Sequence, residues 1–229
     1  MHKPLSISNA PYIFRNFEHW KAYRASALFR DLAAGYEQKT GNRIVSLTYY
    51  GERHLTSNKE IKGPDDMKGM KLRVPQAPLY VLFAKIYGAN PTPIAFAEVY
   101  LALQQGTVDG QENPLPTILA KKFYEVQKYI HLTAHITESL VTALGKPLLA
   151  KLSADEQKLF AEVLGQAASK ATDAIRVSEQ KLPAEFEKLG KAVTRPDREA
   201  FRKVAVPAHL GPEALAFWSK EQYEALQKL

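Results

Sequence analysis

The sequence predicts an α/β fold with a mostly parallel sheet. Over residues 18–145, short segments rich in β-branched and aromatic residues alternate with amphipathic segments, and the final third is almost entirely helical in pattern. The chain has 229 residues, which is enough for one large domain or two small lobes with a real core. One helix expected in the final third is too long for a single lobe, and a helix of that length can span two lobes.

The first two thirds of the chain are divided by glycine and proline into short elements. Apolar residues from Trp20 to Tyr36 recur at three- and four-residue steps and predict a helix over 18–40, which Gly41 ends. A strand is expected over 43–50, ended by Gly51, and a second over 71–74, ended by Pro75. We expect further helices over 65–68, 78–87, 96–105 and 115–127, and further extended segments over 108–113, 129–132 and 138–145.

The C-terminal third contains the long helix. The pattern Ser153-Ala-Asp-Glu156 is a capping box, and the apolar periodicity that follows it continues to about Leu189, with a kink expected at Pro183. At about 1.5 Å per residue this helix would exceed roughly 50 Å. Two further helices are expected over 198–205 and 212–227.

The composition excludes several classes of protein. There is no cysteine, which rules out disulfide scaffolds, thiolate metal sites and cysteine nucleophiles. The 31 basic and 24 acidic residues give a net charge of +7, but the basic residues are not clustered, so we expect no nucleic-acid partner. No apolar run approaches the roughly 18 residues of a membrane span. The segment from Met1 to Ser6 lacks the apolar stretch of a secretion signal.

No motif in the sequence predicts catalysis. There is no Gly-x-Ser-x-Gly elbow, phosphate-binding glycine loop or His-Glu-x-x-His pair. His131 and His135 are four residues apart, but the pattern around them is extended and a structural role is favoured over metal binding. Asp109 and Glu112 are close enough for acid–base chemistry, although carboxylates in such a turn more often accept backbone hydrogen bonds. We therefore expect no metal, no cofactor and no catalytic residue.

Three polar residues suggest an anion site. Strand alternation places Arg73 on the face opposite its neighbours Leu72 and Val74, as a surface residue of an edge strand or as an inward-facing anion-binding group. Arg53 and Asn113 lie at boundaries between a predicted strand and a loop, and in open α/β sheets ligands bind outside the carboxyl ends of strands. If the three converge, two guanidinium groups and an amide form a pocket for a carboxylate.

Several motifs occur in a fixed order along nearly the whole chain. They are Ala10-Pro-Tyr-Ile-Phe14 with Glu18-His19, Gly51-Glu-Arg53, Gly69-Met-Lys-Leu-Arg73-Val-Pro75, Glu98-Val-Tyr100 and Val108-Asp-Gly-Gln-Glu-Asn-Pro114. In this combination the chain resembles the substrate-binding proteins of TRAP (tripartite ATP-independent periplasmic) transporters, the DctP-like family. The resemblance implies a two-lobed periplasmic-binding-protein fold, type II-like, that closes on an organic acid and is braced by a long helix spanning both lobes.

The resemblance also implies a set of ligand-binding residues. By motif position, Arg73 pairs with the ligand carboxylate, Arg53 assists it and Asn113 adds a polar contact. Phe96 matches an aromatic position that packs near the ligand. Gln76 lies where family members vary and would help to set specificity, and Tyr50 is a further candidate.

The resemblance implies lobe boundaries as well. Lobe I would comprise residues 1–50 and 139–178, lobe II residues 51–138 and 179–206, and residues 207–229 would form a C-terminal helix. Family members begin with a secretion signal and a strand–helix–strand section, so we expect lobe I to be incomplete here, with exposed apolar surface and impaired closure.

The function implied is non-enzymatic. The protein would bind an organic acid in the periplasm and deliver it to the TRAP membrane permease subunits, without spanning the membrane itself. Two alternatives remain open from the sequence: a small-molecule enzyme on an α/β scaffold, and a fragment that binds nothing.

Overall fold

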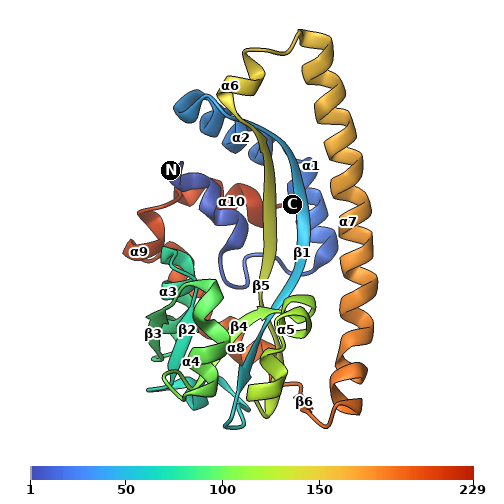
Figure 1. Cartoon of the computed structure of the whole chain (residues 1–229). Coiled ribbons are helices and arrows are strands. Elements are labelled where there is room, and N and C mark those ends of the chain that lie inside the picture. Colours follow the sequence, from blue (N-terminus) through green and yellow to red (C-terminus); the bar gives the residue numbers. More distant parts are fainter. Residues whose placement is uncertain (1) are drawn as a thin grey trace.

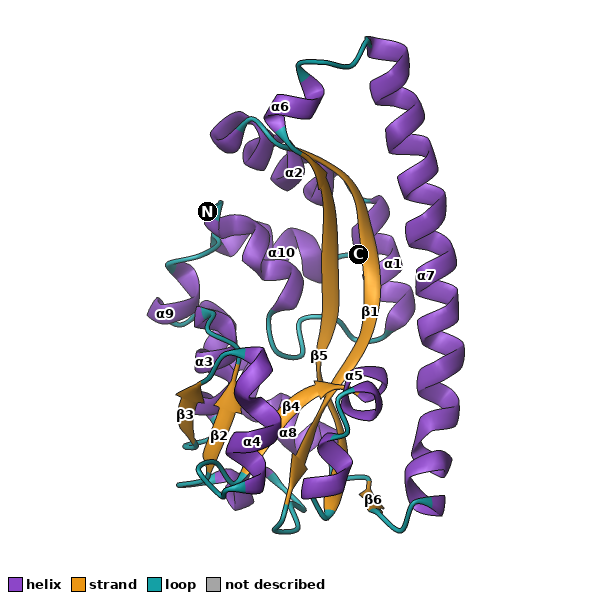
Figure 2. Ribbon diagram, viewed as in Figure 1, coloured by secondary structure: helices purple, strands orange, loops and turns teal. Residues whose placement is uncertain are grey.

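The computed structural model describes residues 2–229 and contains one mixed six-stranded sheet (Figures 1 and 2). The strand order is β3-β2-β4-β1-β5-β6. Strand β2 is parallel to β3 and β4, and β5 is parallel to β6, whereas β1 is antiparallel to both β4 and β5. The strands are β1 (Arg43–Ser57), β2 (Lys71–Val74), β3 (Asn90–Pro93), β4 (Gly110–Pro114), β5 (Tyr129–Leu144) and β6 (Ala192–Thr194).

The prediction of a mostly parallel sheet is wrong for the two longest strands. Strands β1 and β5 have 15 and 16 residues and pair antiparallel from Arg43↔Leu144 to Ser57↔Tyr129. The sequence suggested that Gly51 ends the first strand, but β1 continues through it because glycine adopts the positive φ of 105° found there. The register shifts between Tyr49 and Glu52, so the ribbon bends at Gly51 without losing its pairing. The extended segments expected over 129–132 and 138–145 likewise belong to the single strand β5.

The helices agree with the sequence except where a cap residue divides them. The helix predicted over 18–40 is two helices, because Ser26 has extended backbone (ψ 161°) and its side chain accepts a hydrogen bond from the N–H of Phe29. The segment 212–227 is divided in the same way by Ser219, whereas 115–127 is interrupted at Lys122, whose backbone is left-handed (φ 57°), and 207–229 is not one helix. The α-helices are α1 (Phe17–Ala25), α2 (Ala27–Thr40), α3 (Pro78–Ile86), α4 (Val99–Gln104), α5 (Leu115–Ala120), α6 (Lys146–Leu149), α7 (Ala154–Lys188), α8 (Arg198–Ala205), α9 (Pro212–Leu215) and α10 (Lys220–Gln227), and the 3-10 helices are η1 (Lys3–Asn9), η2 (Pro64–Met67), η3 (Phe96–Glu98), η4 (Phe123–Val126) and η5 (Val206–Leu210).

Helix α7 is the predicted long helix. It starts at the capping box of Ser153 and Glu156, has 35 residues and includes Pro183 without ending there. It lies beside β1 along the length of the molecule (Figure 1). At about 1.5 Å per residue it is about 50 Å long, so it contacts both ends of the β1–β5 ribbon.

Three clusters of buried apolar residues form the core. The first packs α1, α2 and the C-terminal segment on the upper ribbon around Trp20, Tyr23 and Trp218. The second and third lie against the lower sheet, the second with Phe83 of α3 and Phe201 of α8 and the third with residues of α4, α5 and α7. Helix α3 joins the first two clusters, because Leu79 belongs to one and Phe83 to the other. The ends of the molecule are therefore coupled through α3.

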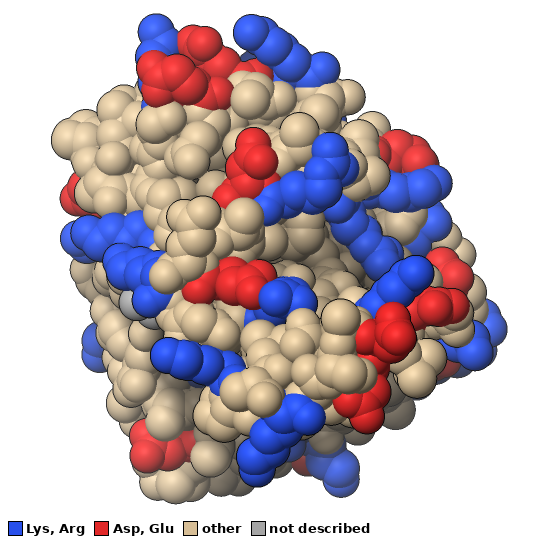
Figure 3. All heavy atoms as spheres, turned by 90° about the horizontal axis from the view of Figure 1, so that it is seen from above, with Lys and Arg blue, Asp and Glu red and all other residues tan. Residues whose placement is uncertain are grey.

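The surface has mixed character. Lysine and arginine are interspersed with acidic residues on the face in Figure 3, which agrees with their scatter along the sequence. Large apolar side chains are exposed on the upper β5 and α7, and they include Leu140, Val141, Leu159, Phe160 and Val163. Within residues 2–229, no helix is both long and apolar enough to cross a membrane.

We expect Gly51→Ala to destabilise the protein by about 1–3 kcal/mol, since a side chain at φ 105° is strained. The added Cβ would also lie 3.1 Å from Glu179 Oε2 and 3.3 Å from Pro114 Cβ. Gly165→Ala in α7 is the control, because nothing lies within 4 Å of its Cβ position, and it should be neutral or stabilising by up to about 1 kcal/mol. Urea unfolding measures both, and equal stability of the two variants would contradict the role of Gly51.

Candidate functional site

Arg73 is a buried cation without a carboxylate partner. It lies in β2 and is 2% exposed. Its Nε and Nη2 both donate to the backbone oxygen of Ile94, at 3.0 and 2.7 Å, while Nη1 is buried and has no hydrogen-bond partner within residues 2–229. Burial lowers the pKa of Arg73 to about 10, which still leaves it charged at neutral pH. The surface alternative for Arg73 is wrong, and the Nη1 group of its guanidinium has hydrogen-bonding capacity that no described residue uses.

Asn113 and Phe96 lie near this guanidinium. Arg73 pairs in the sheet with Gln111 of β4, whose side-chain oxygen accepts a hydrogen bond from Asn113 Nδ2 at 2.6 Å. Asn113 itself is 5% exposed. The ring centroid of Phe96 lies 5.9 Å from Arg73 Cζ, and this ring is 42% exposed. The arrangement joins a cation, an amide and an accessible aromatic face at the end of β2 and β4.

Arg53 lies beside this group, but its guanidinium is already paired. It is 5% exposed and forms a two-pronged ion pair with Glu112, in which Nη2 donates to Oε1 at 2.8 Å and Nε donates to Oε2. Nη1 donates to Glu138 Oε2 at 2.8 Å, and Nη2 also lies 3.3 Å from Asn113 Oδ1. Burial alone would lower the pKa of Arg53, but the two carboxylates raise it. Arg53 therefore fixes Asn113 and Glu112, and its role toward a ligand stays a prediction.

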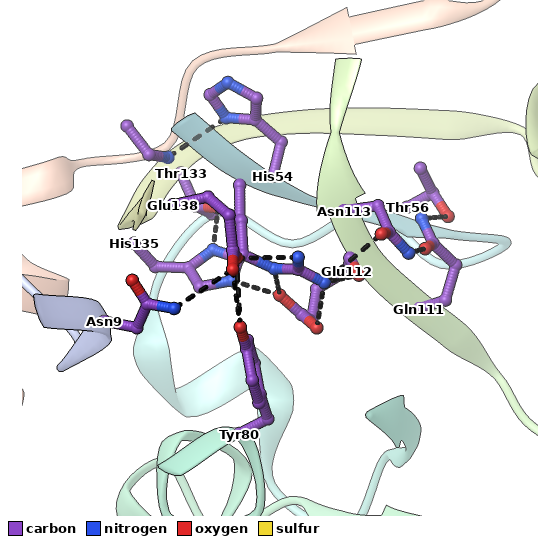
Figure 4. Close-up of polar contacts among 12 residues, drawn as sticks. Asn9, His54, Thr56, Tyr80, Gln111, Glu112, Asn113, Thr133, His135 and Glu138 are labelled. Atoms are coloured by element: carbon purple, nitrogen blue, oxygen red, sulfur yellow. Dashed lines mark hydrogen bonds and ion pairs between the residues drawn. The ribbon is translucent and has the colours of Figure 1, made fainter. Parts of the chain in front are cut away.

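Glu138 connects Arg53 to Asn9 of η1 and to Tyr80 of α3 (Figure 4). Its Oε1 accepts from Asn9 Nδ2 at 3.1 Å and from the Tyr80 hydroxyl at 2.8 Å. Asn9 is tied to the neighbouring strand residue, since its Oδ1 accepts from the N–H of Ser139 at 2.9 Å. Tyr80 belongs to α3, the helix that follows the strand of Arg73. One carboxylate thus joins η1, β5, α3 and the Arg53 pair.

His135 completes the cluster. Its Nε2 lies 3.1 Å from Glu112 Oε2, its Nδ1 lies 2.7 Å from the Thr133 hydroxyl, and its ring stacks on Phe83 at 4.0 Å. His131 is also fully engaged, with Nε2 2.8 Å from the Ser57 hydroxyl and Nδ1 2.7 Å from the Thr194 hydroxyl. Neither histidine is available to a metal, and residues 2–229 contain no group of three or more possible metal ligands.

The remaining two predicted residues lie further out. Gln76 is exposed and lines a cavity of about 580 Å³ between α3 and α9, together with Val81, Lys85 and Phe217. Tyr50 is 38% exposed, and its hydroxyl lies 3.5 Å from the Thr117 hydroxyl of α5. The structure thus groups Arg73, Arg53, Asn113 and Phe96, and leaves Gln76 and Tyr50 at the margins.

Sequence reasoning missed the partners of Arg53. Asp109 does accept a backbone hydrogen bond, from Lys71 N–H at 2.7 Å, but Glu112 is an ion-pair partner instead. Glu138 and Tyr80 are distant in sequence and belong to no motif. The antiparallel pairing of β1 with β5 brings Glu138 to Arg53, and the packing of α3 against the sheet brings Tyr80 to Glu138.

The comparisons with known proteins identify the family of the chain. Residues 1–213 match the model of the DctP family, described as bacterial extracellular solute-binding protein, family 7. The chain belongs to this family. The predicted family and fold class are therefore confirmed.

Individual relatives are similar over most of this chain. The sialic acid-binding periplasmic protein SiaP of Vibrio cholerae is 38% identical over 199 residues, which cover 87% of this chain and 62% of SiaP. The 2,3-diketo-L-gulonate-binding periplasmic protein YiaO of Escherichia coli is 31% identical, with 86% and 60% covered. The chain thus spans about three fifths of the length of these relatives.

Two solved structures extend the comparison. A TRAP periplasmic solute-binding protein from Roseobacter denitrificans with bound 3-deoxy-D-manno-oct-2-ulosonic acid has a TM-score of 0.94 and 31% identity, and the match covers all of this chain and 76% of that one. A second from a Polaromonas species, bound to D-erythronate, has a TM-score of 0.87 and 35% identity, with 100% and 75% covered.

Glu112→Gln should destabilise the protein by about 3–5 kcal/mol, because it leaves the buried Arg53 charge short of a carboxylate. The matched control is Glu18→Gln, which breaks an exposed pair with Lys21 and should change stability by less than about 0.5 kcal/mol. Urea unfolding of both variants measures the difference. A loss at Glu112 no larger than at Glu18 would show that the buried pair does not stabilise the fold.

Acid should destabilise the protein through its buried histidines. Burial lowers the pKa of His54 to about 3 and of His131 to about 4, so below about pH 6.5 only the unfolded chain takes up these protons. Each of these histidines should then lower the free energy of unfolding of the protein by roughly 2 kcal/mol between pH 7 and pH 5. Burial raises the pKa of Glu179 to about 7, and this carboxyl offsets about 2 kcal/mol of that loss.

Urea unfolding of the wild type and of Glu179→Gln at pH 7 and pH 5 separates the contribution of Glu179 from that of the histidines. The variant, which lacks the offsetting carboxyl, should lose roughly 2 kcal/mol more than the wild type over this range. Equal pH dependence in the two proteins would contradict the raised pKa of Glu179.

Proposed function

We propose that this protein captures an organic acid for a TRAP transporter and that the ligand carboxylate binds Arg73. One observation carries the proposal: Nη1 of this buried arginine has no partner within residues 2–229, and the other donors reach only a neutral carbonyl. Burying a charge without an opposite charge is costly, and a ligand carboxylate compensates that cost by direct hydrogen bonds. Arginine is suited to this role because its planar fork matches a carboxylate.

The relatives support a hydroxylated acid as the substrate class. Their names and bound molecules are sialic acid, 2,3-diketo-L-gulonate, 3-deoxy-D-manno-oct-2-ulosonic acid and D-erythronate. All four are carboxylic acids that carry several hydroxyl groups. We propose the same class for this chain, with Asn113 donating or accepting beside the carboxylate and Phe96 packing on the carbon skeleton.

Arg53 would act mainly by holding Asn113 and Glu112 in position beside the ligand. Its ion pairs with Glu112 and Glu138 hold it in place, and its Nη2 contacts Asn113. The positive charge of Arg53 would also attract an anionic ligand bound at Arg73. Gln76 and Tyr50, at the margins of the group, would contact the distal part of a longer acid and so affect specificity.

Capture would proceed by closure of two lobes. We propose the boundaries expected from the family: 1–50 with 139–178 as lobe I, 51–138 with 179–206 as lobe II, and 207–229 as a C-terminal segment. Ligand contacts made only when the lobes are closed shift the equilibrium toward that state. The protein would act in the periplasm, perform no reaction on the ligand, and pass it to the permease subunits.

Arg73→Ala should weaken binding of a hydroxylated acid by about 2–5 kcal/mol, and Arg73→Lys should lose much of it, because a point charge cannot replace the fork. Calorimetric titration with N-acetylneuraminate, 3-deoxy-D-manno-octulosonate and erythronate measures this. Arg30→Ala, an exposed arginine of α2, is the control and should bind as the wild type does. Unchanged affinity in Arg73→Ala would remove Arg73 from the site, and no binding of any of these acids by the wild type would contradict the substrate class.

A further inference from the structure

A second cavity lies between α7 and the β1–β5 ribbon. Its volume is about 370 Å³, and residues of β1, α5, β5, α7 and the segment before α8 line it. Arg73, Asn113 and Phe96 are not among them. The proposed acid site and this cavity are therefore lined by different side chains, although both adjoin β1.

His54 supplies a fixed donor to this cavity. The side chain is 6% exposed, and its Nδ1 accepts a hydrogen bond from the N–H of Ala134 at 3.0 Å. An accepting Nδ1 carries no proton, so in the neutral ring the proton is on Nε2. That Nε2–H has no hydrogen-bond partner within residues 2–229. The ring of His54 lies apart from Glu138 and Tyr80 (Figure 4), so it does not belong to the Arg53 cluster.

Two arginines face the same cavity. Arg195 is exposed and forms no hydrogen bond or ion pair with the part of the chain that the structure describes. Arg198 has one ion pair, 3.5 Å from its Nη2 to Glu52 Oε1, and that distance leaves its donors weakly satisfied. Arg195 and Arg198 therefore leave donors free in a lining that also contains the carboxyl groups of Glu52 and Glu179.

The two carboxyl groups of the cavity are already engaged, and the amide of Gln180 is the remaining side-chain acceptor in the lining. The Glu179 carboxyl accepts from the Tyr49 hydroxyl at 2.6 Å and from the N–H of Glu52 at 3.2 Å, and Glu52 itself pairs with Arg198. A ligand that enters would meet free donors, so it must bring acceptor oxygens. Opposite these polar groups the lining is apolar, with Leu115, Leu132, Ala134 and Pro183.

We propose that this cavity is a second small-molecule site, which binds a monocarboxylate with an apolar body. The carboxylate accepts from His54 Nε2–H and from Arg195, and the apolar body packs against Leu132 and Pro183. This ligand class differs from the hydroxylated acids proposed for Arg73 in its apolar body, which suits the apolar side of the cavity formed by Leu115, Leu132, Ala134 and Pro183. The site touches α7 and both long strands, so a ligand there would contact the elements that join the two ends of the molecule.

Benzoate is a suitable probe, with benzyl alcohol as the uncharged analogue. In a two-dimensional amide spectrum, benzoate should shift the Ala134 N–H, which is bonded to His54, in a saturable way, and benzyl alcohol should do so far more weakly. Arg195→Gln should weaken benzoate binding by about tenfold, the effect of losing a charged hydrogen bond. Arg202→Gln, on α8 but outside the cavity lining, is the matched control and should bind as the wild type does.

Arg73→Gln separates the two sites. Benzoate affinity and the Ala134 shift should be unchanged in this variant, even if binding of hydroxylated acids is lost. The proposal is overturned if the wild type shows no saturable binding of benzoate, if Arg195→Gln binds it as tightly as Arg202→Gln, or if Arg73→Gln abolishes the Ala134 shift. Because benzoate is measured independently of any sugar acid, failure of the Arg73 site would leave this result intact.

Discussion

The site depends on the unequal compensation of two buried arginines. Arg53 has the carboxylates of Glu112 and Glu138, so its charge is neutralised inside the protein. Arg73 has only the carbonyl of Ile94 as a hydrogen-bond acceptor, so it forms no ion pair within the described chain. The Arg53–Glu112 ion pair holds the surrounding side chains in place, and we propose that the unpaired Arg73 guanidinium binds the ligand. If Glu112 paired with Arg73 instead, the charge of Arg73 would be compensated inside the protein and its guanidinium would not need a ligand anion.

Much of this arrangement was predictable from the sequence, because local patterns determine local features. The capping box at Ser153, the strand around Arg73 and the family motifs at Arg53 and Asn113 led to the long helix and the anion group. The antiparallel ribbon was not predictable, since Gly51 normally ends a strand and here only bends one. Glu138 was missed for the same reason, since its approach to Arg53 depends on that ribbon. Tyr80 was missed because its contact with Glu138 joins a helix and a strand 58 positions apart, and no spacing rule describes partners that only tertiary packing brings near.

The bend at Gly51 also explains why polar groups concentrate at mid-ribbon. On one side, Arg53 reaches Glu138, which is bonded to Asn9 of η1 and to Tyr80 of α3. On the other side, Glu52 and His54 face α7 and line the second cavity. Side chains alternate between the two faces of β1, so the proposed acid site and the second cavity lie on opposite faces of the ribbon near the bend. Ligands on the two sides would act on the same bend.

The most direct test of the account is a crystal structure of the protein with a hydroxylated acid bound. We predict that a carboxylate oxygen of the acid lies within hydrogen-bond distance, about 3 Å, of Arg73 Nη1, while the Arg53–Glu112 pair is unchanged. An acid bound elsewhere, with Arg73 still bonded only to the Ile94 carbonyl, would contradict the central claim. So would an acid that displaces Glu112 from Arg53, because that arginine would then be the primary anion group.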